Sequence, residues 1–256
     1  VGNVSASSVY VKAKTKSAKD VGIEVIDYHL EESTSEDELL KIINKLNNQD
    51  NVSGILVQLP LPKNMNEQKI LDSINPDKDA DGFHPLNVGK LSISSKIIDD
   101  LLVPCTPLGC LIMLKSLDLN LEGKHAVVVG RSNIVGKPMA QLLIKESCTV
   151  TIAHSRTKNI EDLCRRADII IAAVGKPNFI KNNWVKDNVV IIDVGINRLE
   201  EKTDDGTKIK LVGDVNFDSV KDKCSAISPV PGGVGPMTIA CLLKNTTIAF
   251  KNTLKL

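Results

Sequence analysis

Apolar residues in the first part of the chain follow two spacings, one helical and one extended. The apolar positions of 39–46 recur at i, i+3, i+4 and i+7, and Ser35 with Glu38 forms a capping box that begins this helix. Other segments are continuous apolar runs. We expect strands over 21–30 and 54–59, and further helices over 6–20 and 67–73. Helices that alternate with strands favour a parallel sheet.

The pattern changes after a polar, turn-rich stretch over 75–104. Thr106 and Pro107 then resemble the capped start of a helix. Apolar segments follow, each of which predicts a strand: 125–129, 149–153, 169–174, 189–194 and a shorter one near 211–212. Helices between these segments complete a doubly wound, Rossmann-type domain.

These patterns predict an α/β protein of two domains. We expect an N-terminal α/β domain over 1–104, a Rossmann-type domain over 105–234, and a C-terminal helix within 235–256 that returns to the first domain. The chain begins with Val1-Gly2-Asn3, which is typical of the end of a strand. We therefore expect the first domain to be truncated at its N-terminus, which would expose a strand edge.

The composition narrows the range of partners. The 32 Lys and Arg residues nearly balance 31 Asp and Glu, for a formal net charge of +1, so the chain has no basic field for general nucleic-acid binding. Aromatic residues, at 3%, are too scarce for a base-stacking surface. No apolar run approaches the roughly 18 residues of a membrane helix. We expect no nucleic-acid partner and no membrane partner.

Cysteine and histidine positions argue against a metal site. The six cysteines include no CxxC pair, and the four histidines lack ligand spacing. The thiols are typical of a reduced, cytoplasmic protein, and the sequence leaves an organellar form open.

A glycine turn between a strand and a helix is a candidate nucleotide site. It reads Gly130-Arg-Ser-Asn-Ile-Val-Gly136, in which glycines let the backbone approach a diphosphate and the helix start offers unpaired N–H groups. The segment departs from GxGxxG, because Ser132 replaces the second glycine and the last glycine comes one position late. Taken alone, this segment is also compatible with a structural turn.

The end of the next predicted strand indicates the kind of dinucleotide. An NAD site usually has an acidic residue about 20 positions after the first glycine, where it holds the ribose 2′-hydroxyl. Here that strand ends in His154-Ser155-Arg156, without an acid. With Arg131 beside the first glycine, two guanidinium groups suit a 2′-phosphate. We therefore predict NADP as the cofactor.

Three further segments carry polar residues at positions typical of enzyme sites. Tyr10 and Lys14 share one helix face at i, i+4. Gln58 stands at the end of a predicted strand in Gln-Leu-Pro-Leu, where parallel-sheet enzymes place their sites. The run 231–238, PGGVGPMT, joins a glycine turn to a helix that begins with proline. Without other information, Lys14 would be one solvated lysine among several.

Nine segments together resemble a known family. They are SSVYVKAK (7–14), GILVQLPLP (54–62), DKDADGFHPLNVGKL (77–91), PCTPLG (104–109), GRSNIVGKP (130–138), HSRT (154–157), DVGIN (193–197), GDV (213–215) and PGGVGPMTIA (231–240). They resemble the bifunctional methylenetetrahydrofolate dehydrogenase–methenyltetrahydrofolate cyclohydrolase family over essentially the whole chain. That family normally has further chain before the point where this sequence begins.

The resemblance implies an activity. The family oxidises 5,10-methylenetetrahydrofolate by hydride transfer to NADP⁺ and then hydrolyses the methenyl product to 10-formyltetrahydrofolate, in one-carbon metabolism and purine biosynthesis. It also implies tetrahydrofolate substrates and a homodimer.

The resemblance further implies roles for single residues. Lys14 matches the catalytic lysine of the cyclohydrolase step, and Gln58 the glutamine that hydrogen-bonds it. Asp81 matches the aspartate that pairs with the pterin, and Tyr10 the tyrosine that stacks on the aminobenzoyl ring. The other implied substrate residues are Ser7, Pro231, Gly232 and Gly233. The implied cofactor residues are Gly130, Arg131, Ser132, Ile134, Gly136, Ser155, Arg156 and, beside the nicotinamide, Ile196.

Three alternatives remain at this point. The first is a dehydrogenase with little cyclohydrolase activity, against which Lys14 and Gln58 argue. The second is a catalytically silent protein that binds NADP or folate. The third is a shikimate-type NADP dehydrogenase, which lacks the Gln-Leu-Pro-Leu and Pro-Gly-Gly-Val-Gly-Pro runs.

Overall fold

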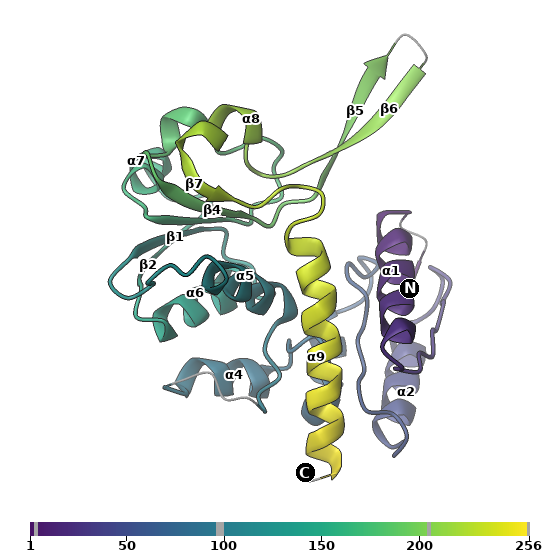
Figure 1. The fold of residues 1–256 in the computed structure, drawn as a ribbon. Helices are drawn as coiled ribbons and strands as arrows, with labels where there is room; N and C mark the ends of the chain where they lie inside the picture. Colours follow the sequence, from purple (N-terminus) through teal and green to yellow (C-terminus); the bar gives the residue numbers. More distant parts are fainter. Residues whose placement is uncertain (3–4, 96–99, 204–205, 255–256) are drawn as a thin grey trace. The chain divides into compact units, whose positions relative to one another are not determined.

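The computed structural model describes residues 1–2, 5–95, 100–203 and 206–254, with only the backbone described at 5–9, 202–203 and 206–207. The chain divides into two compact units. The first contains Val1–Lys90, Ile98–Val103 and Leu242–Leu256, and the second contains Leu91–Ile97 and Pro104–Cys241. Helices α4 (Pro85–Ile93) and α9 (Val234–Leu254) each continue from one unit into the other (Figure 1).

The helices of the first unit follow the helical spacing of the sequence. They are α1 (Ser5–Asp20), α2 (Glu36–Asn47), α3 (Glu67–Asp72) and the short 3₁₀ helix η1 (Pro76–Lys78). The predicted capping box is present, since Ser35 Oγ accepts from the Glu38 N–H at 3.3 Å and the Ser35 N–H donates to the Glu38 carboxylate at 2.8 Å. The predictions of α1, α2 and α3 are confirmed, whereas η1 and α4 were not foreseen.

The strands expected in the first unit do not form in the described residues. Segment 21–30 begins with a turn at 21–22, forms no strand after it, and is largely exposed, with Ile26 58% accessible. Segment 54–59 makes an isolated bridge between Ile55 and Asp79, not a ladder. An apolar run indicates that a segment tends to be buried, but it does not specify another segment with which it would form a β-ladder. The prediction of strands was wrong here for that reason.

The core of the first unit lies between α2, α3 and segment 54–59. Leu39 and Ile43 of α2 and Ile70 of α3 are at most 5% exposed and pack with Ile55 and Val57. Buried Lys78 closes the C-terminal end of α2, because its ammonium donates to the Asn47 carbonyl at 2.9 Å and the Gln49 carbonyl at 2.7 Å. A cation there also complements the helix dipole.

The second unit is built on a parallel sheet of the predicted kind. Its strands are β1 (His125–Val129), β2 (Thr149–Ala153), β3 (Ile169–Ala172), β4 (Val189–Asp193) and β7 (Cys224–Ile227), in the order β2-β1-β3-β4-β7. Four strands agree with the sequence analysis. The fifth is Cys224–Ile227, so the expectation of a sheet strand near 211–212 was wrong. Those residues belong to β6 (Gly206–Val212), which pairs with β5 (Asn197–Thr203) in a separate antiparallel hairpin that extends away from the sheet (Figure 1).

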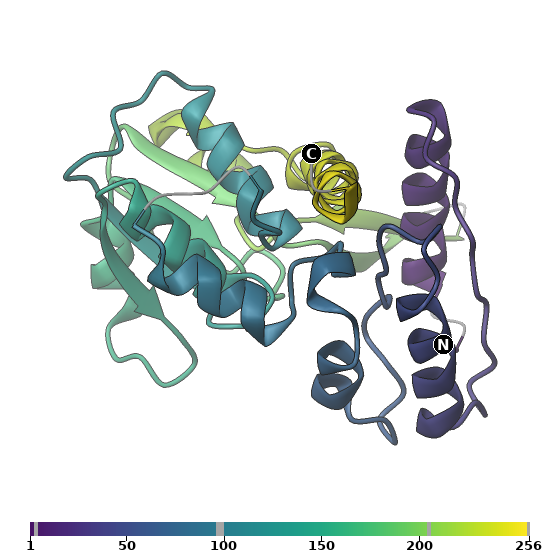
Figure 2. The same ribbon diagram turned by 90° about the horizontal axis from the view of Figure 1, so that it is seen from below.

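Helices cover both faces of this sheet, which completes the predicted doubly wound architecture. Helices α5 (Cys105–Lys115) and α6 (Gly136–Lys145) lie on one face, and α7 (Ile160–Arg165) and α8 (Phe217–Val220) lie on the other (Figure 1, Figure 2). The remaining elements are the 3₁₀ helices η2 (Asn182–Trp184) and η3 (Lys221–Lys223).

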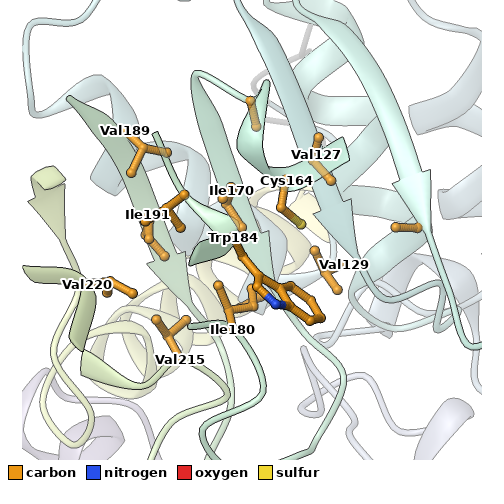
Figure 3. Packing of buried hydrophobic residues seen from close by; sticks show 14 residues of the cluster. Val127, Val129, Cys164, Ile170, Ile180, Trp184, Val189, Ile191, Val215 and Val220 are labelled. Atoms are coloured by element: carbon orange, nitrogen blue, oxygen red, sulfur yellow. The ribbon is translucent and has the colours of Figure 1, made fainter. Parts of the chain in front are cut away.

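Alternate strand residues fill the core beneath α7. Val127, Ile170 and Ile191 are fully buried and point to the same face, where Trp184 covers them (Figure 3). The Trp184 ring meets Phe179 edge-on, with 4.9 Å between centroids. This packing fixes the strands, and with them the loops that leave their carboxyl ends.

Two helix starts differ from the predicted ones. Helix α5 begins at Cys105, and the Thr106 hydroxyl does not cap it but pairs with the Thr238 hydroxyl at 3.0 Å. Helix α9 begins at Val234, two residues before Pro236, so the proline lies within its first turn.

All six cysteines are free thiols. Burial raises the pKa of both Cys110 and Cys164 to about 12, which keeps these two protonated near neutral pH. In the described part of the chain, no helix is both long and apolar enough to cross a membrane.

Asn245 of α9 binds the backbone of two other segments of the first unit, and substituting it tests how much these bonds stabilise the protein. Its buried amide donates to the carbonyls of Ala80 and Val103 at 2.9 and 2.8 Å. Replacing it in Asn245→Leu removes both bonds, and we expect the free energy of unfolding to fall by about 2–4 kcal/mol in urea denaturation. The exposed Thr247→Val change on the same helix is the control, with less than about 0.5 kcal/mol expected. Equal stability of the two variants would contradict this role.

Candidate functional site

In the first unit, Lys14 and Gln58 meet although they are far apart in sequence. Lys14 Nζ donates to Gln58 Oε1 at 3.2 Å, and the Gln58 amide donates to the Leu59 carbonyl at 2.8 Å. The second bond fixes which end of the amide faces the lysine. Lys14 Nζ also lies 4.8 Å from the centroid of the Tyr10 ring, close enough for a cation–π contact. Tyr10 and Lys14 thus share one face of α1, as the i, i+4 spacing predicted.

Asp81 joins this group electrostatically. Its pKa is raised, first by burial of the carboxyl and then by the neighbouring Asp79 charge, while the charge of Lys14 lowers it in part. Lys14 is therefore close enough to act on Asp81. Part of the Asp81 residue is accessible to solvent, but its carboxyl is surrounded by protein, so burial is the larger cause.

Asp79 holds the turn that presents Asp81, and sequence reasoning missed this role. It is 2% exposed, and its carboxylate accepts from the backbone N–H groups of Gly82 and His84 at 3.1 and 2.8 Å. The side-chain amide of Asn87 donates to it at 2.9 Å. In the sequence, Asp79 and Asp81 are alike, and only the structure shows that Asp79 is the one whose carboxylate binds the backbone of the turn.

A cavity of about 1030 Å³ lies within the first unit, alongside α1, α2 and segments 22–30 and 51–58. Lys14 and Gln58 contribute to its lining, whereas neither Tyr10 nor Asp81 does. The rest of its lining is mostly apolar, for example Ile23, Leu39 and Val57. The four residues of the Lys14 group therefore do not converge on this cavity.

The other substrate residues expected from the sequence lie in different surroundings. Ser7 is in α1, but its side chain is outside the described part of the chain. Pro231 and Gly232 belong to the second unit, in an exposed turn that leads into α9. Gly232 has φ +98°, a conformation open to glycine, and Val230–Pro231 is a cis peptide, as is Leu59–Pro60.

The predicted nucleotide residues gather at the carboxyl edge of the parallel sheet. Strand β1 pairs with β2 so that Val129 lies opposite Ala153, and the Gly130 N–H donates to the Ala153 carbonyl at 2.8 Å. The loops that begin at Gly130 and His154 therefore leave the sheet side by side. Gly130 has φ +133°, and a Cβ there would collide with the Ala173 carbonyl, so only glycine fits.

Ser132 changes the expected picture of the helix start. Its hydroxyl accepts from the Val135 and Gly136 N–H groups at 3.1 and 3.3 Å. The expectation of unpaired N–H groups at the start of α6 was therefore wrong for these two donors. A hydroxyl that accepts two bonds still has one proton to donate, so Ser132 can offer this proton to a phosphate oxygen.

The arginines proposed for the 2′-phosphate stand in exposed loops. Arg131 follows Gly130, and Arg156 lies in a turn that its neighbours close: the Arg156 N–H donates to His154 Nδ1 at 3.2 Å, and Thr157 Oγ1 accepts from the His154 N–H at 2.8 Å. These bonds fix the backbone beside Ser155 and leave both guanidinium groups accessible. The donor set, with no acid at the end of β2, fits a phosphorylated ribose. Ile134 is half-buried and Ile196 is 60% exposed.

Two buried aspartates at the same edge were not selected as site residues. Asp193 ends β4, and its carboxylate accepts from the N–H groups of Gly195, Asp214 and Val215 at 2.9–3.0 Å. Asp214 is fully buried and accepts from Val174, Gly175 and Lys176 N–H groups at 2.6–3.0 Å, and from the Asn197 amide at 2.9 Å. All of these partners except the Asn197 amide are backbone groups, which side-chain spacing cannot reveal.

Among the described residues, no group of three or more His, Cys, Asp or Glu side chains is arranged to hold a metal ion.

Two family models match the chain in consecutive parts. The tetrahydrofolate dehydrogenase/cyclohydrolase catalytic domain matches residues 1–81, and the tetrahydrofolate dehydrogenase/cyclohydrolase NAD(P)-binding domain matches residues 104–254. The chain belongs to the tetrahydrofolate dehydrogenase/cyclohydrolase family. The second match covers the parallel sheet and every residue expected at the nucleotide.

Relatives of this family are similar over nearly the whole chain. The bifunctional protein FolD of Acetivibrio thermocellus is 56% identical over 98% of this chain and 84% of its own. The FolD crystal structure from Campylobacter jejuni is 48% identical, with a TM-score of 0.90 over 98% of this chain and 86% of that one. FolD of Trypanosoma brucei, solved with NADP cofactor and an inhibitor, is 37% identical, with a TM-score of 0.93 over 100% and 86%.

Asp193 gives the second unit a distinctive pH dependence. Burial raises its pKa from 3.8 to about 6, more than its backbone bonds lower it. The native state therefore holds this proton more tightly than the unfolded chain. The stabilisation is fully present below pH 3.8 and is lost as the pH rises through about 6, a change of up to about 3 kcal/mol.

This change can be isolated by comparison with Asp193→Asn, which does not titrate at that position. The difference in unfolding free energy between wild type and variant should shift in favour of the variant between pH 4 and pH 7. A constant difference across that range would show that Asp193 has an ordinary pKa.

Proposed function

We propose that this chain oxidises 5,10-methylenetetrahydrofolate to 5,10-methenyltetrahydrofolate by hydride transfer to NADP⁺, and then hydrolyses the methenyl compound to 10-formyltetrahydrofolate. The observation that carries the proposal is the bond between Lys14 Nζ and Gln58 Oε1 in a chain of this family. The names of its relatives, which are called bifunctional, support it as well.

Lys14 is the residue that we assign to the hydrolysis. Opening the methenyl ring requires water to lose a proton as it attacks, and a positioned amine can exchange that proton. Gln58 orients Nζ through its carbonyl oxygen, and the Tyr10 ring, whose centroid is 4.8 Å from Nζ, borders the amine on another side. Asp81 supplies carboxyl oxygens that can pair with the amino and ring N–H groups of a pterin.

The second unit carries the residues that we assign to NADP. When bound, the nicotinamide accepts the hydride. Arg131 and Arg156 bind the 2′-phosphate, the Ser132 proton reaches a phosphate oxygen, and the close contact of Gly130 with Ala173 keeps that part of the turn free of side chains. The other residues that we assign to contacts with the cofactor are Ile134, Gly136, Ser155 and Ile196.

Several expectations stay predictions. These are a homodimer, a cytoplasmic location, and contacts of Ser7, Pro231, Gly232 and Gly233 with the folate. Sedimentation equilibrium tests the dimer directly. The three predicted domain ranges, 1–104, 105–234 and 235–256, also stay predictions.

The test of the proposal is an assay of both activities on one purified protein. Wild type should reduce NADP⁺ with methylenetetrahydrofolate and hydrolyse methenyltetrahydrofolate. In Lys14→Met, hydrolysis should fall by about 100-fold or more, because the proton-exchanging group is lost. Lys16→Met is the matched control, since Lys16 is an exposed lysine of the same helix. Hydrolysis retained in Lys14→Met would refute its assigned role.

Cofactor choice is tested by removing both guanidinium groups. In Arg131→Ala/Arg156→Ala, the KM for NADP⁺ should rise by about 100-fold, since each charged hydrogen bond contributes about 1.5–3 kcal/mol. The KM for NAD⁺ should change less than about 3-fold. The double variant Arg165→Ala/Arg166→Ala, at exposed positions where α7 ends, controls for lost surface charge. An equal loss for both dinucleotides would overturn the assignment to the 2′-phosphate.

A further inference from the structure

Asp214 connects two loops that leave the carboxyl edge of the sheet. One carboxylate oxygen accepts from the Val174 and Gly175 N–H groups in the loop after β3. The other accepts from the Lys176 N–H and from the Asn197 amide, which ends the loop after β4. One fully buried side chain therefore accepts four hydrogen bonds, three from the loop after β3 and one from Asn197, where the loop after β4 meets β5.

These loops stand where a parallel sheet binds its ligand. In the order β2-β1-β3-β4-β7, successive strands are added to one side of β1 and then, from β3 onward, to its other side. Ligands bind outside the carboxyl ends of the strands at the point where the strand order reverses in this way. The loop after β3 touches the predicted nucleotide turn, because the Ala173 carbonyl fills the space where Gly130 would carry a Cβ. The loop after β4 contains Ile196, whose side chain is exposed.

Asp193 fixes Asp214 in turn. It accepts from the backbone N–H of Asp214 at 2.9 Å and from that of Gly195, in the loop after β4, at 3.0 Å. Gly195 and Gly213 pack directly on the two carboxylates, so a Cβ at Gly195 would overlap the Asp214 side chain and one at Gly213 the Asp193 side chain. The two aspartates therefore form one packed connection from β4 to both loops.

The partners of the Asp214 carboxylate show that it positions the loops and does not support the parallel sheet as a whole. The sheet strands already satisfy one another, and the Asp214 carboxylate bonds to none of them. Gly175, Lys176 and Ile196 are exposed, so this part of the loops has little apolar packing to hold it. A carboxylate can accept four N–H bonds from two oxygens, whereas an amide has a single acceptor oxygen.

We propose that Asp214, oriented by Asp193, is a positioning residue for hydride transfer: it holds the loops after β3 and β4 against the nicotinamide end of the dinucleotide. This proposal rests on the proposed function. It assigns Asp214 no contact with substrate or cofactor.

The test compares Asp214→Asn with Asp218→Asn, an exposed aspartate of the same unit. Misplacing a reacting group by about 1 Å can cost on the order of 100-fold, so the dehydrogenase kcat of Asp214→Asn should fall by about 10- to 100-fold. Hydrolysis of methenyltetrahydrofolate and the Kd for 2′,5′-ADP, which lacks the nicotinamide half, should stay within about 2-fold of wild type. Asp218→Asn should change none of the three.

Two outcomes would overturn the proposal. One is an unchanged dehydrogenase kcat, and the other is an equal loss of hydrolysis, 2′,5′-ADP binding and hydride transfer, which would mean general structural support. If Asp214→Asn does not fold, Asn197→Ala provides the test, because it removes one of the four bonds to the Asp214 carboxylate. It also removes the longer bond, at 3.5 Å, from the same amide to the Val212 carbonyl. It should lower the dehydrogenase kcat by about 3- to 10-fold, with the same selectivity.

Failure of the proposed function is recognised separately in wild type. A wild type that binds NADP but transfers no hydride would refute the dehydrogenase activity. The ratio of the Kd values for NADP and 2′,5′-ADP would still report positioning, since Asp214→Asn should weaken NADP alone. A ratio that stays at the wild-type value would refute the proposal in that case.

Discussion

The carboxyl edge of the parallel sheet depends on burying two carboxylates where backbone N–H groups are their main partners. An ionised carboxylate taken out of water is costly unless hydrogen bonds replace its hydration. Asp193 and Asp214 receive seven such bonds between them, six from the backbone. The loops must adopt one conformation to supply these donors, and glycines must stand where the carboxylates pack. The shape of the nucleotide edge follows from that requirement.

The first unit uses buried charge in the same way. Asp79 gathers two backbone N–H groups and the Asn87 amide, and thereby orders the turn that carries Asp81. Lys78, its neighbour, donates to carbonyls at the end of α2. In both units, a buried aspartate lies two or three residues from a residue to which we assign a ligand contact: Asp79 precedes Asp81, and Asp193 precedes Ile196. The buried aspartate fixes the backbone from which the other side chain extends.

The sequence located the four strands β1 to β4, in each of which most residues are apolar, including the partly exposed β2. Strand β7, Cys-Ser-Ala-Ile, is short and mixed and was missed. The apolar run over 21–30 was not a strand, because hydrophobicity does not specify a pairing partner. The resemblance to a family singled out Lys14 and Gln58. Asp214 escaped, since its role lies in acceptor bonds to the backbone, which no spacing of side chains encodes.

The Ser132 hydroxyl links the ordering of the first turn of α6 to the binding of the dinucleotide phosphate. Its oxygen accepts from the first N–H groups of α6, and its proton is the group that we assign to a phosphate. When the phosphate fixes the direction of that proton, the two lone pairs are held toward the helix start. Ligand binding and the order of this first turn are then thermodynamically linked, so each favours the other by the same free energy. The helix start becomes part of the binding equilibrium, and the affinity for the dinucleotide includes the free energy of ordering it.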